Sequence, residues 1–79
     1  MTIQILGSGC ANCKKLEQLA RDAVAELGLS ATVEKITDFN RIGEMGVVAT
    51  PGFAIDNAVK STGRVLSKDQ IIQFLRGEK

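Results

Sequence analysis

The chain has 79 residues, of which 44% are hydrophobic and 24% are charged, and its formal net charge at pH 7 is +1. This size and composition predict a single folded domain spanning residues 1–79, near the lower size limit for independent folding. The dispersed, nearly balanced charges argue against a nucleic-acid-binding surface. No apolar stretch approaches the roughly 20 residues needed to cross a bilayer, so we expect no membrane association.

The first half of the chain predicts a strand, a helix and a second strand. Residues 2–6 are rich in isoleucine and suit a strand, and the glycines after them mark a turn. From Ala11 onward, apolar residues recur every three or four positions, which predicts a helix of about four turns that ends at Gly28. The β-branched residues within 31–36 favour the second strand. The apolar stripe of the helix consists of Leu16, Leu19, Ala20, Ala23, Val24 and Leu27.

A short second helix is expected after the second strand. Thr37 and Asp38 can cap it, and it would run to about Met45 before Gly46 ends it. The apolar residues in and just after this segment are interpreted first as core residues, although those nearest the cysteines would also suit a binding surface. They are Phe39, Met45, Val47 and Val48.

The last third of the chain predicts a hairpin and a final helix. Residues 52–55 and 58–61 suit antiparallel strands joined by a tight turn at Asp56–Asn57. Ser67 and Gln70 have the spacing of a capping box, so we expect the final helix to begin there.

The order of these elements is β-α-β-α-β-β-α. A helical connection between the first two strands implies that they are parallel, whereas the late hairpin adds an antiparallel pair. The predicted fold class is therefore α/β, with a four-stranded mixed sheet flanked by three helices.

Cys10 and Cys13 are the only cysteines in the chain, which also has no histidine, tryptophan or tyrosine. The N-terminus lacks the basic start and long apolar run of a signal peptide, so we expect a cytoplasmic protein. Cysteine pairs in the cytosol are more often catalytic or metal-binding than structural. A C-x-x-C between a strand and a helix is therefore interpreted as a site of thiol–disulfide exchange.

The expected position of the two cysteines on the helix gives them different roles. Residues three apart lie on one face of a helix, close enough for a disulfide after modest movement. Cys10 would lie in the first turn, where unpaired N–H groups and the helix dipole stabilise a thiolate. Cys13 would lie one turn deeper and be more buried. We therefore expect Cys10 to attack as the nucleophile and Cys13 to resolve the mixed disulfide.

A structural or metal-binding role of the cysteine pair is the alternative to exchange. A disulfide that closes so small a loop contributes only about 2 kcal/mol, against about 4 kcal/mol for a loop of roughly 60 residues, which disfavours a structural staple. A structural zinc site needs four ligands, and one chain offers two thiolates. Two-coordinate Cu(I) binding and transfer, or a four-thiolate site shared by two copies of the chain, stays open as an alternative. A non-catalytic binding module is a second alternative.

The chain resembles the thioredoxin-like superfamily, and more narrowly the small thioredoxin/glutaredoxin-like proteins called redox-active disulfide protein 2. The resemblance rests on the stretch Gly7-Ser8-Gly9-Cys10-Ala11-Asn12-Cys13, on Thr50-Pro51-Gly52 before the third strand, and on the element order. Two features depart from typical thioredoxins. Gly9 stands where they have a tryptophan, and residues 2–6 hold no acidic side chain to serve as a buried carboxylate.

The resemblance implies a site and its partners. It implies that Thr50–Pro51 is a cis peptide beside the cysteines, where the backbone of Thr50 pairs with an extended substrate segment. Ala11 and Asn12 are expected to complete the substrate-binding surface. The expected partners are protein disulfides and a reductase or low-molecular-weight thiol, with a monomeric chain, no bound metal, and no cofactor beyond the redox-active disulfide.

Overall fold

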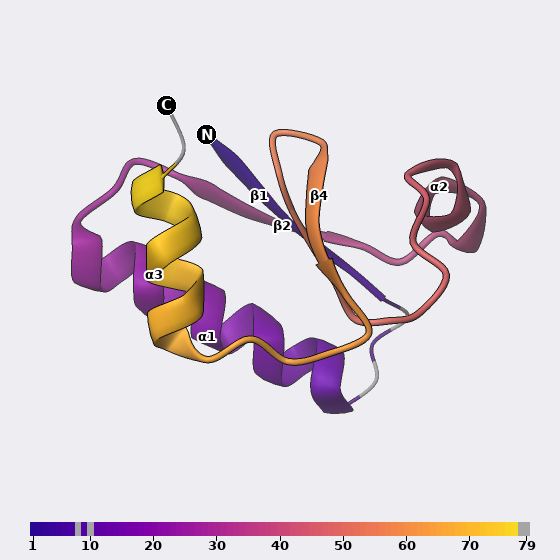
Figure 1. The fold of residues 1–79 in the computed structure, drawn as a ribbon, viewed down its shortest axis with the longest axis horizontal. Helices are drawn as coiled ribbons and strands as arrows, with labels where there is room; N and C mark the ends of the chain where they lie inside the picture. Colours follow the sequence, from indigo (N-terminus) through magenta and orange to yellow (C-terminus); the bar gives the residue numbers. More distant parts are fainter. Residues whose placement is uncertain (8, 10, 78–79) are drawn as a thin grey trace.

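The computed structural model describes residues 1–7, 9 and 11–77 of the chain. The order of strands and helices agrees with the predicted order (Figure 1). The elements are β1 (Thr2–Leu6), α1 (Ala11–Leu27), β2 (Thr32–Ile36), α2 (Phe39–Glu44), β3 (Gly52–Ile55), β4 (Ala58–Thr62) and α3 (Lys68–Gly77). The differences from the predicted bounds are one residue at each of three ends: β2 begins at Thr32, α2 ends before Met45, and β4 extends to Thr62.

The strands form one mixed sheet in the order β2-β1-β3-β4. β1 and β2 are parallel because α1 connects them, and β1 pairs with β3 in the antiparallel direction. The β3–β4 hairpin is antiparallel and contains a register shift between Phe53 and Ala54. The predicted α/β class with a four-stranded mixed sheet and three helices is confirmed.

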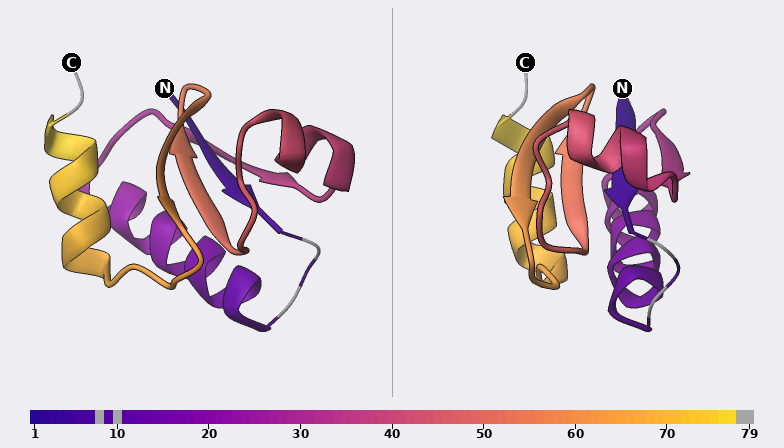
Figure 2. Two further views of the ribbon diagram at one scale, coloured as in Figure 1. Left: turned by 45° about the vertical axis from the view of Figure 1, so that its right-hand side comes forward. Right: turned by 90° about the vertical axis from the view of Figure 1, so that its right-hand side faces the viewer.

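The helices divide the molecule into three layers (Figure 2). α1 and α3 pack on one face of the sheet, and the shorter α2 packs on the other. The alternation of side chains along β1 produces this division. Ile3 and Ile5 contribute to the core beneath α1 and α3, whereas Leu6 joins Ile36 and Ile42 in a smaller core beneath α2.

The ends of the elements are formed by the predicted local signals. Gly28 has a φ of +64° and ends α1 in the left-handed conformation. The Asp38 side chain caps α2 by accepting a hydrogen bond from the Asn40 N–H. Ser67 and Gln70 form the reciprocal capping box at the start of α3.

The hairpin turn is anchored to the start of β1. Asp56 and Asn57 both have positive φ, as a two-residue hairpin turn requires. The Asp56 side chain accepts a hydrogen bond from the Thr2 N–H, and the side chain of Gln4 is paired with Asn57. Gln4 is only 3% exposed, so these hydrogen bonds satisfy a polar side chain in the centre of the sheet.

No helix in the described part of the chain combines the length and apolar character that crossing a membrane requires.

Candidate functional site

Cys13 belongs to the buried face of α1. The residues of α1 that are buried recur at intervals of three or four, and Cys13 is the first of them. Its exposed fraction is 5%, and it is disulfide-bonded. Leu16, Ala20 and Ala23 continue the same stripe toward the core. The predicted nucleophile Cys10, like Ser8, lies outside the described residues, so its role stays a prediction.

Gly7 lies directly against the Cys13 sulfur at the end of β1. It follows Ile3 and Ile5 at alternating positions, so a side chain here would point toward α1. A Cβ on Gly7 would overlap Cys13 Sγ and would lie 3.2 Å from Cys13 Cβ. The sulfur therefore occupies space that any residue other than glycine would fill. The sequence predicts a turn at Gly7 and includes it in the motif that carries the resemblance, and the period of two along β1 is the signal for its orientation toward α1.

Thr50 approaches the same point from the loop before β3. Its Cβ lies 3.7 Å from the position that a Gly7 Cβ would take. The structure thus brings two of the predicted site residues, Cys13 and Thr50, to the end of β1. These residues belong to segments far apart in the sequence, and pairing between β1 and β3 aligns them, with Leu6 opposite Gly52.

The Thr50–Pro51 peptide bond is cis in this structure. Thr50 is exposed, whereas Pro51 is buried, so the bond lies at the boundary between surface and core. The Pro51 carbonyl accepts a 3.0 Å hydrogen bond from the Gly63 N–H, beyond the end of β4. The loop before β3 is thereby held to the neighbouring strand.

The exposed residues at the start of α1 and in the loop before Thr50 include both polar and apolar side chains. Ala11 and Asn12 are exposed at the start of α1. Val48, two residues before Thr50, is 97% exposed, so its interpretation as a core residue was wrong. Val47 is only 3% exposed and packs beneath α2.

Phe39 is also exposed, to 70%, although the sequence favoured a core position. α2 has only six residues and presents one buried side chain, Ile42, to the sheet. Met45 is half-buried against the same cluster, as predicted for a packing residue.

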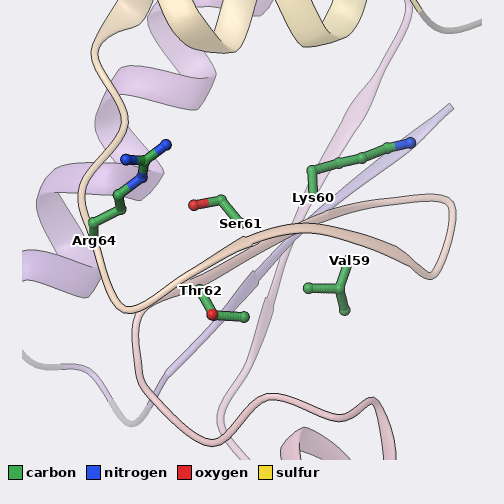
Figure 3. Close-up of a pocket in the computed structure, with 5 residues that line it drawn as sticks. All are labelled: Val59, Lys60, Ser61, Thr62 and Arg64. Atoms are coloured by element: carbon green, nitrogen blue, oxygen red, sulfur yellow. The ribbon is translucent and has the colours of Figure 1, made fainter.

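Two shallow hollows lie elsewhere on the surface. One runs along the edge strand β4 (Figure 3), and its residues are Val59, Lys60, Ser61, Thr62 and Arg64. These side chains project to both sides of the strand instead of converging, which is unlike a ligand site. The other hollow lies along residues 34–38 and Arg41. Neither is lined by Cys13, Thr50 or Pro51.

The described residues contain no group of three or more cysteine and carboxylate side chains placed to hold a metal ion. At the end of β1, the described residues bring the sulfur atom of Cys13 close to Thr50, an exposed residue.

The chain is similar to one protein family and to two named proteins over most of its length. A family model described as "Thioredoxin domain" matches residues 1–76. A protein named "Thioredoxin" from Methanothermobacter thermautotrophicus is 52% identical over 75 residues, which cover 95% of this chain and 97% of that protein. Another protein named "Thioredoxin", from Methanocaldococcus jannaschii, is 37% identical over 76 residues, covering 96% of this chain and 87% of that protein.

Proposed function

The chain belongs to the thioredoxin domain family and is a thiol–disulfide oxidoreductase, and from that premise we propose that Cys10 and Cys13 exchange a dithiol for a disulfide with protein substrates. The observation that carries the proposal is that Cys13 Sγ and Thr50 both lie beside Gly7 at the end of β1. The Cys13 sulfur there lies close to the exposed residue Thr50, whose backbone would bind an extended segment of a substrate protein. Family membership favours this function over Cu(I) transfer or a non-catalytic binding module.

The exchange proceeds in two displacements when the protein acts as reductant. The Cys10 thiolate attacks one sulfur of a substrate disulfide, forms a mixed disulfide, and releases a substrate thiolate that takes up a proton. Cys13, after losing its proton, attacks the sulfur of Cys10 and releases the second substrate thiolate. The result is a Cys10–Cys13 disulfide and a reduced substrate, with two electrons transferred.

Substrate binding is assigned to the exposed residues around the sulfur. The backbone of Thr50 would pair with an extended segment on one side of the substrate disulfide. Ala11 and Asn12, exposed at the start of α1, would contact the other side. Val48 adds an apolar contact close to Thr50. Because these groups include backbone and small side chains, the site would accept a range of protein sequences.

The protein must be reduced again after each turnover. A reductase or a low-molecular-weight thiol would attack the Cys10–Cys13 disulfide, and no cofactor beyond the cysteine pair is required. We propose a monomer that works in the cytoplasm, where such thiols maintain a reducing poise.

The test is a redox titration combined with single-cysteine variants. The full chain is equilibrated in glutathione buffers of varied ratio, and the dithiol fraction is quantified by alkylation. A transition that fits a two-electron couple in the biological range supports exchange. A disulfide that never equilibrates contradicts it.

The variants assign the roles of the two sulfurs. Cys13→Ser should accumulate mixed disulfides with a model protein disulfide, because the resolving thiol is missing. Cys10→Ser is the matched control and should accumulate none. Equal accumulation by both variants would contradict the assignment of Cys10 as nucleophile.

A further inference from the structure

A side chain on Gly7 would meet two residues, Cys13 and Thr50. On the α1 side, a Cβ at this position would overlap Cys13 Sγ and would be only 3.2 Å from Cys13 Cβ. On the loop side, Thr50 Cβ would be 3.7 Å away. A Cβ contact of 3.2 Å is tighter than ordinary van der Waals packing, and the overlap with sulfur requires an atom to move.

The backbone of Gly7 is not able to retreat easily. Its N–H donates a 2.9 Å hydrogen bond to the carbonyl of Ile36 at the end of β2. The preceding residue, Leu6, is paired with Ile36 on one side and with Gly52 on the other. Displacement of Gly7 would therefore break its hydrogen bond to Ile36 and pull on Leu6, which is paired with both neighbouring strands.

Cys13 is held equally firmly on the opposite side of the contact. It is 5% exposed and begins the stripe of α1 that continues with Leu16, which has no exposed surface. Moving α1 away from β1 would open the larger core beneath α1 and α3. Rotation of the cysteine side chain about its Cα–Cβ bond is the cheapest remaining adjustment.

That adjustment depends on the redox state. A thiol at Cys13 can rotate away from a methyl group on residue 7, because its sulfur has one covalent attachment to the chain. A disulfide sulfur has two attachments and is confined to a narrow range of positions. A side chain at residue 7 would therefore raise the free energy of the disulfide form more than that of the dithiol form.

We propose that Gly7 is a positioning residue whose missing side chain leaves the space for the disulfide sulfur of Cys13, so that the size of residue 7 sets how readily the disulfide is reduced. This inference rests on the proposed thiol–disulfide exchange. It makes Gly7, which lies outside both the C-x-x-C and the Thr50–Pro51 segment, a further residue that determines the redox equilibrium.

The first test is the redox equilibrium of Gly7→Ala with glutathione. One protein disulfide and two glutathione thiols give one protein dithiol and one glutathione disulfide, with two electrons and two protons passing to the protein. The equilibrium constant for this reduction should rise about tenfold or more, which corresponds to a potential roughly 30 mV less negative. A constant equal to that of the parent chain would overturn the inference.

Gly43→Ala is the matched control for this titration. Gly43 lies in α2, and a Cβ there would meet no other atom within 4 Å. It is exposed, lies in a different helix from Cys13 and has no positive φ. Its equilibrium constant should stay within about twofold of that of the parent chain, as for a surface change without steric consequence.

A stability comparison separates the sulfur contact from a general packing defect. The cost of Gly7→Ala is measured by urea unfolding in three backgrounds: the disulfide form, the dithiol form in dithiothreitol, and Cys13→Ala. The cost should be greatest in the disulfide form, smaller in the dithiol form, and smallest when Sγ is absent. An equal cost in all three would overturn the inference.

The same comparison remains decisive if the disulfide form of Gly7→Ala does not fold. Folding of the Gly7→Ala, Cys13→Ala double variant would then support the sulfur contact, whereas failure of all three forms would overturn it. The two proposals also fail differently. Absence of any glutathione couple in the parent chain contradicts the oxidoreductase function, whereas a normal couple left unchanged by Gly7→Ala contradicts only the role of Gly7.

Discussion

The Gly63 N–H and the Pro51 carbonyl form a 3.0 Å hydrogen bond that ties the end of β4 to the loop before β3. Gly63 has a φ of +75°, and a Cβ on it would lie 3.1 Å from Ala49 Cβ. The conformation at Gly63 therefore supports the loop that carries Thr50, although Gly63 does not belong to the cysteine motif.

Gly63→Ala should impair substrate binding as well as stability. An alanine in this left-handed conformation costs about 1–2 kcal/mol, and its methyl group would push against Ala49. The displaced loop should raise KM for a model protein disulfide several-fold. Gly28→Ala is the control, because Gly28 also has a positive φ but no neighbouring atom within 4 Å of a Cβ. Similar KM increases in both variants would show that lost stability alone explains the effect.

Cys10 should be alkylated faster than Cys13 in the reduced chain. Cys13 is 5% exposed, so an alkylating reagent reaches it poorly. We expect the pKa of Cys10, which immediately precedes α1 in the sequence, to lie below the ordinary thiol value of about 8.5. Iodoacetamide rates against pH on Cys10→Ser and Cys13→Ser measure each thiol separately. Faster reaction of Cys13 would contradict the assigned roles.

Val48→Lys should weaken protein substrates without changing the redox equilibrium. Val48 is 97% exposed near Thr50, so a lysine here removes an apolar contact and leaves the core intact. KM for a protein disulfide should rise, while the equilibrium constant with glutathione should not change. Leu29→Lys, at another exposed apolar residue, controls for the added charge. A KM for Val48→Lys equal to that of the parent chain would show that Val48 does not contribute to substrate binding.

Gln4→Leu should destabilise the fold and leave the cysteine chemistry unchanged. Gln4 donates to Asn57 Oδ1 at 2.6 Å and accepts from the Asn57 N–H at 2.7 Å. Loss of these partly buried bonds should cost about 1 kcal/mol in urea unfolding. Gln18→Leu removes an exposed bond to Asp22 and should cost less than about 0.5 kcal/mol. A changed redox equilibrium in Gln4→Leu would indicate an unforeseen link to the site.

The Lys68–Glu26 pair should make the free energy of unfolding depend on pH in the alkaline range. Its 2.9 Å hydrogen bond to Glu26, together with the charge of that carboxylate, raises the pKa of Lys68 above 10.5. Since the folded chain binds this proton more tightly, the stabilisation is complete below pH 10.5 and declines as the pH rises through the raised value. The effect should be small because the pair is exposed to solvent.

Comparison with Lys68→Met measures this contribution. The difference in unfolding free energy between the two chains should be constant from pH 7 to pH 9, which lies below the unfolded value of about 10.5, and should shrink above it. A difference that grows with pH would contradict the sign. Lys14→Met controls for the loss of one exposed positive charge.

Much of the fold followed from short-range signals. The spacing of Leu16, Ala20 and Ala23 predicted α1, and the pairs Asp56–Asn57 and Ser67–Gln70 predicted the hairpin turn and the start of α3. Each signal acts between residues a few positions apart, through side-chain periodicity or a local hydrogen bond. Such signals are visible in the sequence because they do not depend on distant segments.

The exposure of individual apolar residues was less predictable. Phe39 and Val48 are as apolar as Ile42 and Val47, yet the first two are exposed and the last two are buried. For Phe39 and Ile42, the orientation of the six-residue α2 decides which side chain gains contacts, whereas Val47 and Val48 lie in the loop after α2, where no helical period applies. Local periodicity in so short a segment does not determine that orientation.

The sequence by itself determined the element order, the C-x-x-C before α1 and the Thr50–Pro51 pair before β3. Only the tertiary structure decided that Cys13 Sγ and Thr50 both lie beside Gly7. That arrangement depends on the register by which Leu6 pairs with Ile36 and Gly52, and on how closely α1 packs on the sheet. Pairing and packing join segments that are distant along the chain, so no local pattern specifies them.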